Sequence, residues 1–327
     1  MFLNPAIPKM FTPTKKPLEE AFSTLLSRLE LNPTRVRLAS ERYDAIKTHL
    51  ESRLQNVEVK QVGSFRKKTK IRPGDGSDRI DLDVIVCLGN FTGYSDFPGV
   101  GVTPNDALRA VQDALKDNAV YRMMRPRIDA PTIALDYNDD FSVELIPCYR
   151  DLSGRYPRLL GPACYVVGAT GNWEPADYDY DAEYLTQLNQ SSDVDGRLIP
   201  AIKITKAFLR NHGISIKSFF IEIVCAQHLP NVLRFAKLFN TDLGYARHLY
   251  IVLDKLADNL GKQLSFLESH TPPVESGLNP LEELFTKGRL KKLAQDARAL
   301  CNTFYSTALM ERWSDFFGSP FPRGKHD

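Results

Sequence analysis

The chain has 327 residues, of which 43% are hydrophobic and 25% are charged. This composition is typical of a folded protein with enough apolar residues for one large core or two packed domains, and it argues against extensive disorder. The formal net charge is only +2, whereas proteins that coat nucleic acid non-specifically usually carry a strong basic excess. Any basic site must therefore be local.

Cysteine usage and apolar runs exclude further classes. The five cysteines are scattered and form no CxxC or Cys/His spacing, so a zinc site or a disulfide framework has no support. No apolar run approaches the ~20 residues that span a bilayer, and the first residues lack the apolar core of a secretion signal. We expect a soluble protein of the reducing cytoplasm with no membrane partner.

The first half of the chain predicts mixed helices and strands. Apolar residues recur at helical intervals from Leu18 to Leu54, with a break at residues 32–34, so two helices come first. The period then changes to two in VEVKQV, IDLDVIVCL, TIALDY and FSVELIP, which predicts strands, the last two joined as a hairpin around residues 138–140. With the helical stretch Pro104 to Lys116, this half is of the α+β class.

The second half of the chain predicts helices almost throughout. Residues 149–195 show no clear period and are predicted to be a connecting loop with short elements. Helical patterns then cover residues 198–209, 218–228, 241–260, 280–297 and 301–317. We therefore predict a domain of residues 1–195 that includes the N-terminal helices, an α-helical domain of residues 196–317, and a flexible tail of residues 318–327.

Paired carboxylates define the candidate site. In IDLDVIV, Asp81 and Asp83 point to one face of the strand, and Ile80 and Leu82 point to the other. Carboxylates held this close repel each other and raise each other's pKa unless a cation neutralises them, so the pair indicates a site for Mg²⁺ or Mn²⁺. An edge strand with alternating polar residues gives the same pattern without a metal.

A third carboxylate can join the pair from a neighbouring strand. In FSVELIP, Ser142 and Glu144 share one face, so Glu144 can meet the aspartates across the sheet. Asp136, in the partner strand of the predicted hairpin, is the rival third ligand, and the sequence does not decide between them.

A phosphate-binding loop is predicted just before these strands. Gly63 and Ser64 follow VEVKQV at a point where a glycine lets backbone amides approach a phosphate and a serine hydroxyl can bond to it. The stretch RKKTKIR then supplies the positive charge needed beside a triphosphate. The alternative reading is a simple strand-ending turn followed by solvated charges.

The ordered combination GSFRKKTKIRP, IDLDVIV and VELIP resembles the pattern of the polymerase β-like nucleotidyltransferases. The later segment RLIPAIKITKAFLRNHGISIKSFFIEIV resembles the helical signature of the bacterial cGAS/DncV-like enzymes (CD-NTases, SMODS type), which are related to the oligoadenylate synthetases. The resemblance covers roughly residues 40 to 230. The chain departs from the family in a longer loop before the first aspartate and in glutamate at position 144.

The resemblance implies a polymerase β-like core, a mixed sheet with flanking helices, followed by an α-helical domain that completes the nucleotide pocket. It implies that Lys206 and Ser218 bind the triphosphate; the stem of Lys206 can lie along apolar surface one turn after Ile202. In this reading Asp81, Asp83 and Glu144 hold two Mg²⁺ or Mn²⁺ ions, and the enzyme releases pyrophosphate.

The same resemblance implies a function. NTPs, with ATP foremost, would be joined into a cyclic di- or trinucleotide second messenger that activates a separate effector in anti-phage (CBASS) signalling, with an accessory regulatory protein as a further partner. The alternatives are a template-free transferase acting on an RNA end or a small molecule, and an inactive nucleotide-binding scaffold. The low net charge argues against a stable nucleic-acid template.

Overall fold

The computed structural model describes residues 16–74, 79–90, 102–151, 164–168, 171–303 and 307–323. The chain divides into two compact units. The sheet unit consists of Leu31–Tyr184 and Leu267–Pro272, and the helical unit consists of Met1–Glu30, Leu185–Phe266 and Pro273–Asp327. Within the described ranges, no helix is both long enough and apolar enough to cross a membrane.

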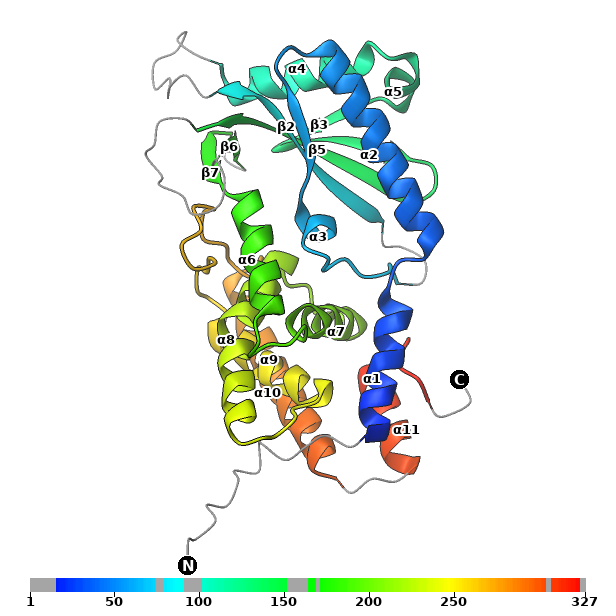
Figure 1. Ribbon diagram of the computed structural model, residues 1–327, viewed down its shortest axis with the longest axis vertical. Helices are drawn as coiled ribbons and strands as arrows, with labels where there is room; N and C mark the ends of the chain where they lie inside the picture. Colours follow the sequence, from blue (N-terminus) through cyan, green and yellow to red (C-terminus); the bar gives the residue numbers. More distant parts are fainter. Residues whose placement is uncertain are drawn as a thin grey trace, which may run out of the picture. The chain divides into compact units, whose positions relative to one another are not determined.

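The sheet unit is built on a seven-stranded mixed sheet with the order β1-β2-β5-β4-β3, in which β6 pairs with both β5 and β7 (Figure 1). β2 and β5 are parallel, and the other neighbouring pairs are antiparallel. The strands are β1 (Glu58–Gln61), β2 (Ile80–Asn90), β3 (Arg127–Asp129), β4 (Thr132–Tyr137), β5 (Phe141–Arg150), β6 (Cys164–Val167) and β7 (Trp173–Ala176). The helices of this part of the chain are α2 (Pro33–Arg53), α3 (Gly63–Arg66), α4 (Pro104–Lys116), α5 (Ala119–Met124) and α6 (Tyr178–Gln190), within which the boundary between the units falls.

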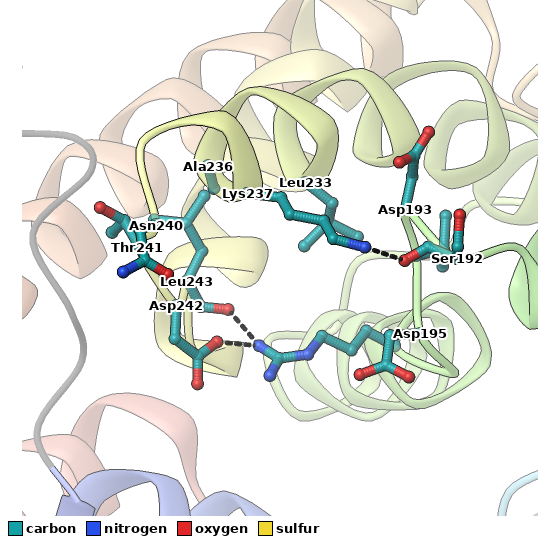
Figure 2. A pocket seen from close by; sticks show the side chains of 12 residues that line it. Ser192, Asp193, Asp195, Leu233, Ala236, Lys237, Asn240, Thr241, Asp242 and Leu243 are labelled. Carbon is teal, nitrogen blue, oxygen red and sulfur yellow. Dashed lines mark hydrogen bonds and ion pairs between the residues drawn. The ribbon is translucent and has the colours of Figure 1, made fainter.

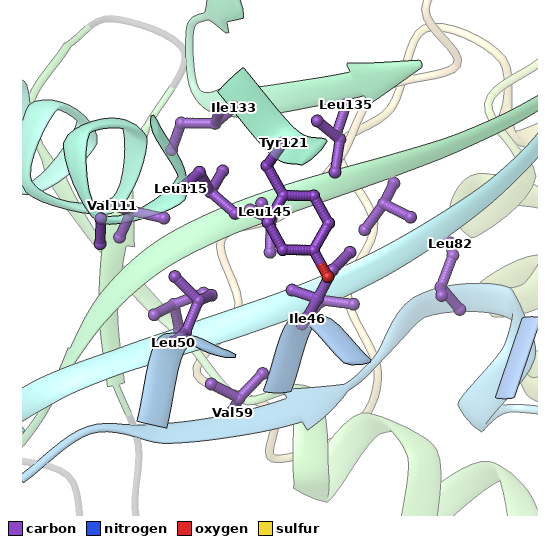
Figure 3. Packing of buried hydrophobic residues seen from close by; sticks show 14 of the residues in the cluster. Ile46, Leu50, Val59, Leu82, Val111, Leu115, Tyr121, Ile133, Leu135 and Leu145 are labelled. Carbon is purple, nitrogen blue, oxygen red and sulfur yellow. The ribbon is translucent and has the colours of Figure 1, made fainter. Parts of the chain in front are cut away.

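One face of the sheet carries the main hydrophobic core. Ile46 of α2 and Leu115 of α4 lie in the same buried cluster as Leu82 of β2 and Leu145 of β5 (Figure 3). Burying such side chains contributes about 1.5–3 kcal/mol each relative to leaving them exposed. The core therefore fixes which face of β2 and β5 is apolar, and side chains at the alternate positions must face the other side. The four predicted strands and the β4–β5 hairpin are confirmed.

The helical unit contains helices from both ends of the chain (Figure 1). They are α1 (Lys16–Leu29), α7 (Leu198–Asn211), α8 (Ser218–Leu238), α9 (Tyr245–Asn259), α10 (Pro280–Asn302) and α11 (Thr307–Phe317). The prediction that α1 belongs to the first domain is wrong. Phe22 of α1 contacts Trp313 at 5.6 Å and Phe321 at 5.1 Å between ring centroids, so its apolar face is buried against the C-terminal end of the chain.

The C-terminal segment is also ordered further than the sequence predicts. Phe321 is only 4% exposed, and Asn211 donates side-chain hydrogen bonds to the carbonyls of Phe317 and Ser319, at 2.9 and 2.6 Å. The prediction of a flexible tail over residues 318–327 is therefore wrong for residues 318–323. The remaining four residues lie outside the described part of the chain.

The stretch between the predicted halves contains more regular structure than expected. Residues 149–195 include the end of β5, strands β6 and β7, and the 13-residue helix α6. The sequence of α6, YDYDAEYLTQLNQ, alternates aromatic and acidic residues, which hides the helical period. The boundary between the units falls at residues 184 and 185 instead of 195 and 196.

Candidate active site

Three carboxylates lie on the face of the sheet opposite the main core. Along β2 the even-numbered residues from Ile80 to Val86 are buried, and Asp81 and Asp83 are partly exposed. The parallel register of β2 and β5 places Asp83 directly beside Glu144, and Asp81 beside Ser142. Neighbouring strands lie about 4.8 Å apart. The two strands therefore bring Asp81, Asp83 and Glu144 together on one face.

The electrostatics of these carboxylates reflect their crowding. The pKa of Asp83 is raised, mainly by burial and further by the charge of Asp81, although Lys70 and Lys67 oppose the rise. The pKa of Glu144 is raised by burial and then by repulsion from Asp83 and Asp81. Groups whose charged forms are disfavoured in this way gain from a bound cation.

Gly63 and Ser64 lie directly against Asp83. Gly63 has a φ of +64°, and a Cβ atom built on it would be 1.8 Å from Oδ2 of Asp83. The backbone N–H of Ser64 donates a hydrogen bond to the Asp83 side chain. The loop predicted to bind phosphate thus adjoins the carboxylates, and only a glycine fits at its first position.

The basic stretch after this loop contributes two cations to the same region. The segment curls back because the N–H groups of Thr69 and Lys70 both donate to the carbonyl of Ser64, at 2.9 and 3.2 Å. The charges of Lys70 and Lys67 lower the pKa of Asp83. The other basic residues of the stretch, Arg66, Lys68 and Arg72, are exposed.

Asp136, the rival third carboxylate, has other partners. It accepts hydrogen bonds from the guanidinium groups of Arg79 and Arg127, both at 2.9 Å, and from the hydroxyl of Ser142 at 3.2 Å. The pKa of Asp136 is lowered because these hydrogen bonds and charges outweigh its burial. A carboxylate already neutralised by two cations has less to gain from a metal than Glu144 has.

Lys206 and Ser218 belong to the helical unit. Lys206, on α7, is 8% exposed, and its ammonium pairs with Glu222 of α8 at 2.7 Å. Ser218 is the exposed first residue of α8. The α7–α8 pair therefore fixes the position of the Lys206 ammonium.

A polar cluster within the sheet unit was not predicted from the sequence. Asp181 of α6 accepts hydrogen bonds from Ser269 at 2.6 Å and from Thr271 at 2.8 Å, and Asp177 lies 2.9 Å from His270. Burial raises the pKa of Asp181 to about 6. These contacts hold residues 267–272 in the sheet unit. Because residues 177–181 and 267–272 are far apart along the chain, no local sequence pattern predicts that they meet.

A cavity of about 560 Å³ lies within the helical unit (Figure 2). Both of its basic side chains already bond to neighbouring groups: Arg197 pairs with Asp242 and donates to the Leu243 carbonyl at 3.0 Å, and Lys237 donates to the Ser192 carbonyl at 2.9 Å. Its lining contains none of the residues predicted to bind nucleotide.

The fold and the carboxylate site together define a class of protein. A mixed sheet that presents acidic residues beside a glycine-serine loop, accompanied by a helical unit, is the polymerase β-like nucleotidyltransferase architecture. Residues 17–158 match the family described as the Second Messenger Oligonucleotide or Dinucleotide Synthetase domain. This match covers a little under half of the chain, and the chain is similar along most of its length to bacterial cGAS/DncV-like nucleotidyltransferases, the CD-NTases, among them a cyclic-oligonucleotide synthase.

Individual relatives show the same likeness. A probable cyclic nucleotide synthase from Bacillus cereus strain VD146 is 26% identical over 197 residues, and the match spans 53% of this chain but only 56% of that relative. A cyclic AMP-AMP-AMP synthase from Acinetobacter sp. is 24% identical over 323 residues, covering 93% of this chain and 85% of the relative. The solved structure of Escherichia coli MS115-1 CdnC in its HORMA-deltaN complex has a TM-score of 0.66 at 13% identity, covering 94% of this chain and 98% of that one, which shows a shared fold.

Proposed function

We propose that this protein joins NTPs into a cyclic trinucleotide, with ATP as a substrate, and that Asp81, Asp83 and Glu144 are its catalytic carboxylates. The observation that carries the proposal is the direct pairing of Asp83 with Glu144 across β2 and β5, two residues from Asp81. The preference for ATP and for a trinucleotide follows the relative that is a cyclic AMP-AMP-AMP synthase.

The donor set fits a divalent cation. Three carboxylates on one face, two of them with raised pKa values, supply hard oxygen ligands and unbalanced negative charge. In the described part of the chain, no group of three or more acidic, histidine or cysteine side chains is already placed to hold a metal ion. Two Mg²⁺ or Mn²⁺ ions would neutralise this charge and acidify the attacking ribose hydroxyl.

Side chains and backbone groups of this chain would orient the donor NTP. Gly63 allows the backbone to approach the phosphates, and the hydroxyl of Ser64 would bond to them. Lys206 and Ser218, on α7 and α8, would bind the triphosphate and stabilise the charge that develops on the departing pyrophosphate. Glu222 would hold the Lys206 ammonium in place through their buried ion pair.

The product would act through other proteins. We expect the cyclic trinucleotide to bind a separate effector in anti-phage (CBASS) signalling in the cytoplasm. CdnC of E. coli forms a complex with HORMA-deltaN, and by analogy we propose an accessory regulatory protein for this chain.

Product analysis tests the proposal. The purified full-length protein is incubated with each labelled NTP, alone and in mixtures, with Mg²⁺ or Mn²⁺, then treated with phosphatase and analysed by chromatography and mass spectrometry. ATP alone should give a phosphatase-resistant cyclic trinucleotide. Label transferred to added RNA or to a small molecule would support the transferase alternative, and a thermal shift with ATP but no product would support an inactive scaffold.

The third carboxylate can be identified with two conservative variants. Glu144→Gln is expected to lower kcat by about 10²-fold or more, because it removes charge from the face that carries Asp81 and Asp83. The kcat of the matched variant Asp136→Asn should stay within about threefold of the wild-type value. The partners of Asp136, Arg79 and Arg127, are largely exposed, and surface ion pairs contribute little to stability. Steady-state kinetics over a Mg²⁺ titration measure kcat for both variants. A larger loss of kcat in Asp136→Asn than in Glu144→Gln would make Asp136 the third ligand.

A further inference from the structure

Three cysteines gather on the face of the sheet that carries the carboxylates. Cys87 of β2, Cys148 of β5 and Cys164 of β6 belong to one buried cluster, and all three are free thiols. Along their strands, Cys87 is four residues from Asp83 and Cys148 is four residues from Glu144. The proposed nucleotide chemistry uses none of these thiols.

The register of the sheet pairs two of these thiols directly. Cys87 and Cys148 are opposite each other in the parallel β2–β5 ladder. Paired Cα atoms on neighbouring strands lie about 4.8 Å apart, which is inside the range of about 4.4–6.8 Å that a disulfide requires. Cys164 pairs with Arg150 and is diagonal to Cys148. The Cα atoms of diagonal neighbours are about 7–8 Å apart, beyond the range that a disulfide requires without backbone movement, although the side chains of Cys164 and Cys148 are close enough to hydrogen-bond.

The environment makes the two paired thiols unequal. The pKa of Cys87 is lowered to about 6, chiefly by a hydrogen bond with the Cys148 side chain and also by the charge of Arg150, although burial and the charge of Glu58 oppose the shift. The Cys87 thiol also hydrogen-bonds to the Gly89 carbonyl, at 3.6 Å. The pKa of Cys148 is raised by its hydrogen bonds to Cys164 and Cys87 and by burial. Cys87 is therefore the nucleophile of the pair, and Cys148 is the thiol that stays protonated.

We propose that Cys87 and Cys148 form a peroxide-sensitive thiol pair that is converted reversibly into a disulfide between β2 and β5. The Cys87 thiolate attacks hydrogen peroxide, the O–O bond breaks, and sulfenic acid and hydroxide form. The Cys148 sulfur then attacks the Cys87 sulfur, the S–O bond breaks, and water leaves as the second thiol proton is transferred. In total, two thiols and one hydrogen peroxide give one disulfide and two waters.

Accessibility restricts the oxidant to a small molecule. Cys87 is 5% exposed and Cys148 is fully buried, so a bulky disulfide such as oxidised glutathione would not reach the pair. Hydrogen peroxide is close to water in size. The lowered pKa of Cys87 gives this thiol a larger thiolate fraction at pH 7 than the few per cent of an ordinary cysteine.

Oxidation of the intact protein tests the proposal. The reduced full-length chain is treated with hydrogen peroxide, quenched with catalase, unfolded in iodoacetamide and digested without reduction for mass spectrometry. A peptide containing Cys87 linked to the peptide containing Cys148 should appear, lighter by two hydrogens and reversed by dithiothreitol. Cys301 is partly exposed and serves as the reference thiol. The Cys87–Cys148 linkage should form about tenfold faster than Cys301 is oxidised.

Matched serine variants assign the roles. Cys87→Ser should abolish the linkage, Cys164→Ser should leave it intact, and Cys148→Ser should accumulate a sulfenic acid on Cys87 that dimedone traps. Should a variant fail to fold, the pH profile of Cys87 alkylation in the native wild-type protein serves instead, with an expected midpoint near 6. The proposal is overturned if native Cys87 stays unmodified at doses that oxidise Cys301, or if Cys148 links to Cys164.

Discussion

Replacing Asp83 by asparagine is expected to lower nucleotidyl transfer by about 10³-fold, equivalent to about 4 kcal/mol of lost transition-state stabilisation. Asparagine keeps the shape and the oxygen that accepts the Ser64 N–H, but it removes the charge beside Glu144. Product formation from ATP, measured at saturating Mg²⁺, gives the size of the loss.

The same substitution should leave the metal-free fold as stable as the wild type or more stable. Because the pKa of Asp83 is raised in the folded state, the folded protein binds this proton more tightly than the unfolded chain, and stability contributed by the group falls as pH rises through the two pKa values. At pH 7 the charged carboxylate is therefore a cost that Asp83→Asn removes. Thermal melts without divalent cations at pH 7 check this expectation.

Cation dependence separates a metal ligand from a merely buried acid. Mg²⁺ or Mn²⁺ should raise the melting temperature of the wild type by mass action, and Asp83→Asn should lose most of that rise. The control variant Asp113→Asn changes a carboxylate on α4 that is 73% exposed. This variant should keep the full rise in melting temperature. An unchanged cation response in Asp83→Asn would remove Asp83 from the proposed ligands.

The features that the sequence predicts correctly all depend on local periodicity. Alternation in IDLDVIV assigns Asp81 and Asp83 to one face, because the apolar residues between them must enter the core that contains Ile46 and Leu115. The β4–β5 hairpin follows from two short apolar runs separated by turn residues. Local periodicity therefore predicts which side chains of a strand or helix face the core.

The features that the sequence misses depend on partners distant in the chain. The amphipathic pattern of α1 shows that Phe22 is buried, but not that Trp313 covers it. Likewise, the cysteines look scattered along the chain, and only the register of β2 and β5 brings Cys87 beside Cys148. Long-range pairing is a property of topology, which no local pattern carries.

Replacing Gly63 by alanine is expected to damage both the fold and the activity. Gly63 has a positive φ of +64°. A residue with a Cβ atom loses about 1–2 kcal/mol of stability in this conformation. In addition, the new Cβ would lie 1.8 Å from Oδ2, 2.6 Å from Cγ and 2.9 Å from Cβ of Asp83. The clash reaches the root of a short side chain, so rotation of the carboxylate cannot relieve it, and β2 or the loop must shift. We expect about 2–4 kcal/mol of destabilisation in urea unfolding and at least a 10²-fold loss of kcat.

Gly213→Ala isolates the contribution of the clash. Gly213 has a φ of +60°, close to that of Gly63, but an added Cβ would meet nothing within 4 Å, so this variant carries only the backbone strain. It should lose about 1–2 kcal/mol of unfolding free energy and keep nearly full activity. Equal effects on kcat from Gly63→Ala and Gly213→Ala would mean that the contact between Gly63 and Asp83 has no part in catalysis. A loss of kcat in Gly63→Ala but not in Gly213→Ala would show that catalysis requires the Asp83 carboxylate to keep its present position. Only a residue without a Cβ atom at position 63 leaves room for that position.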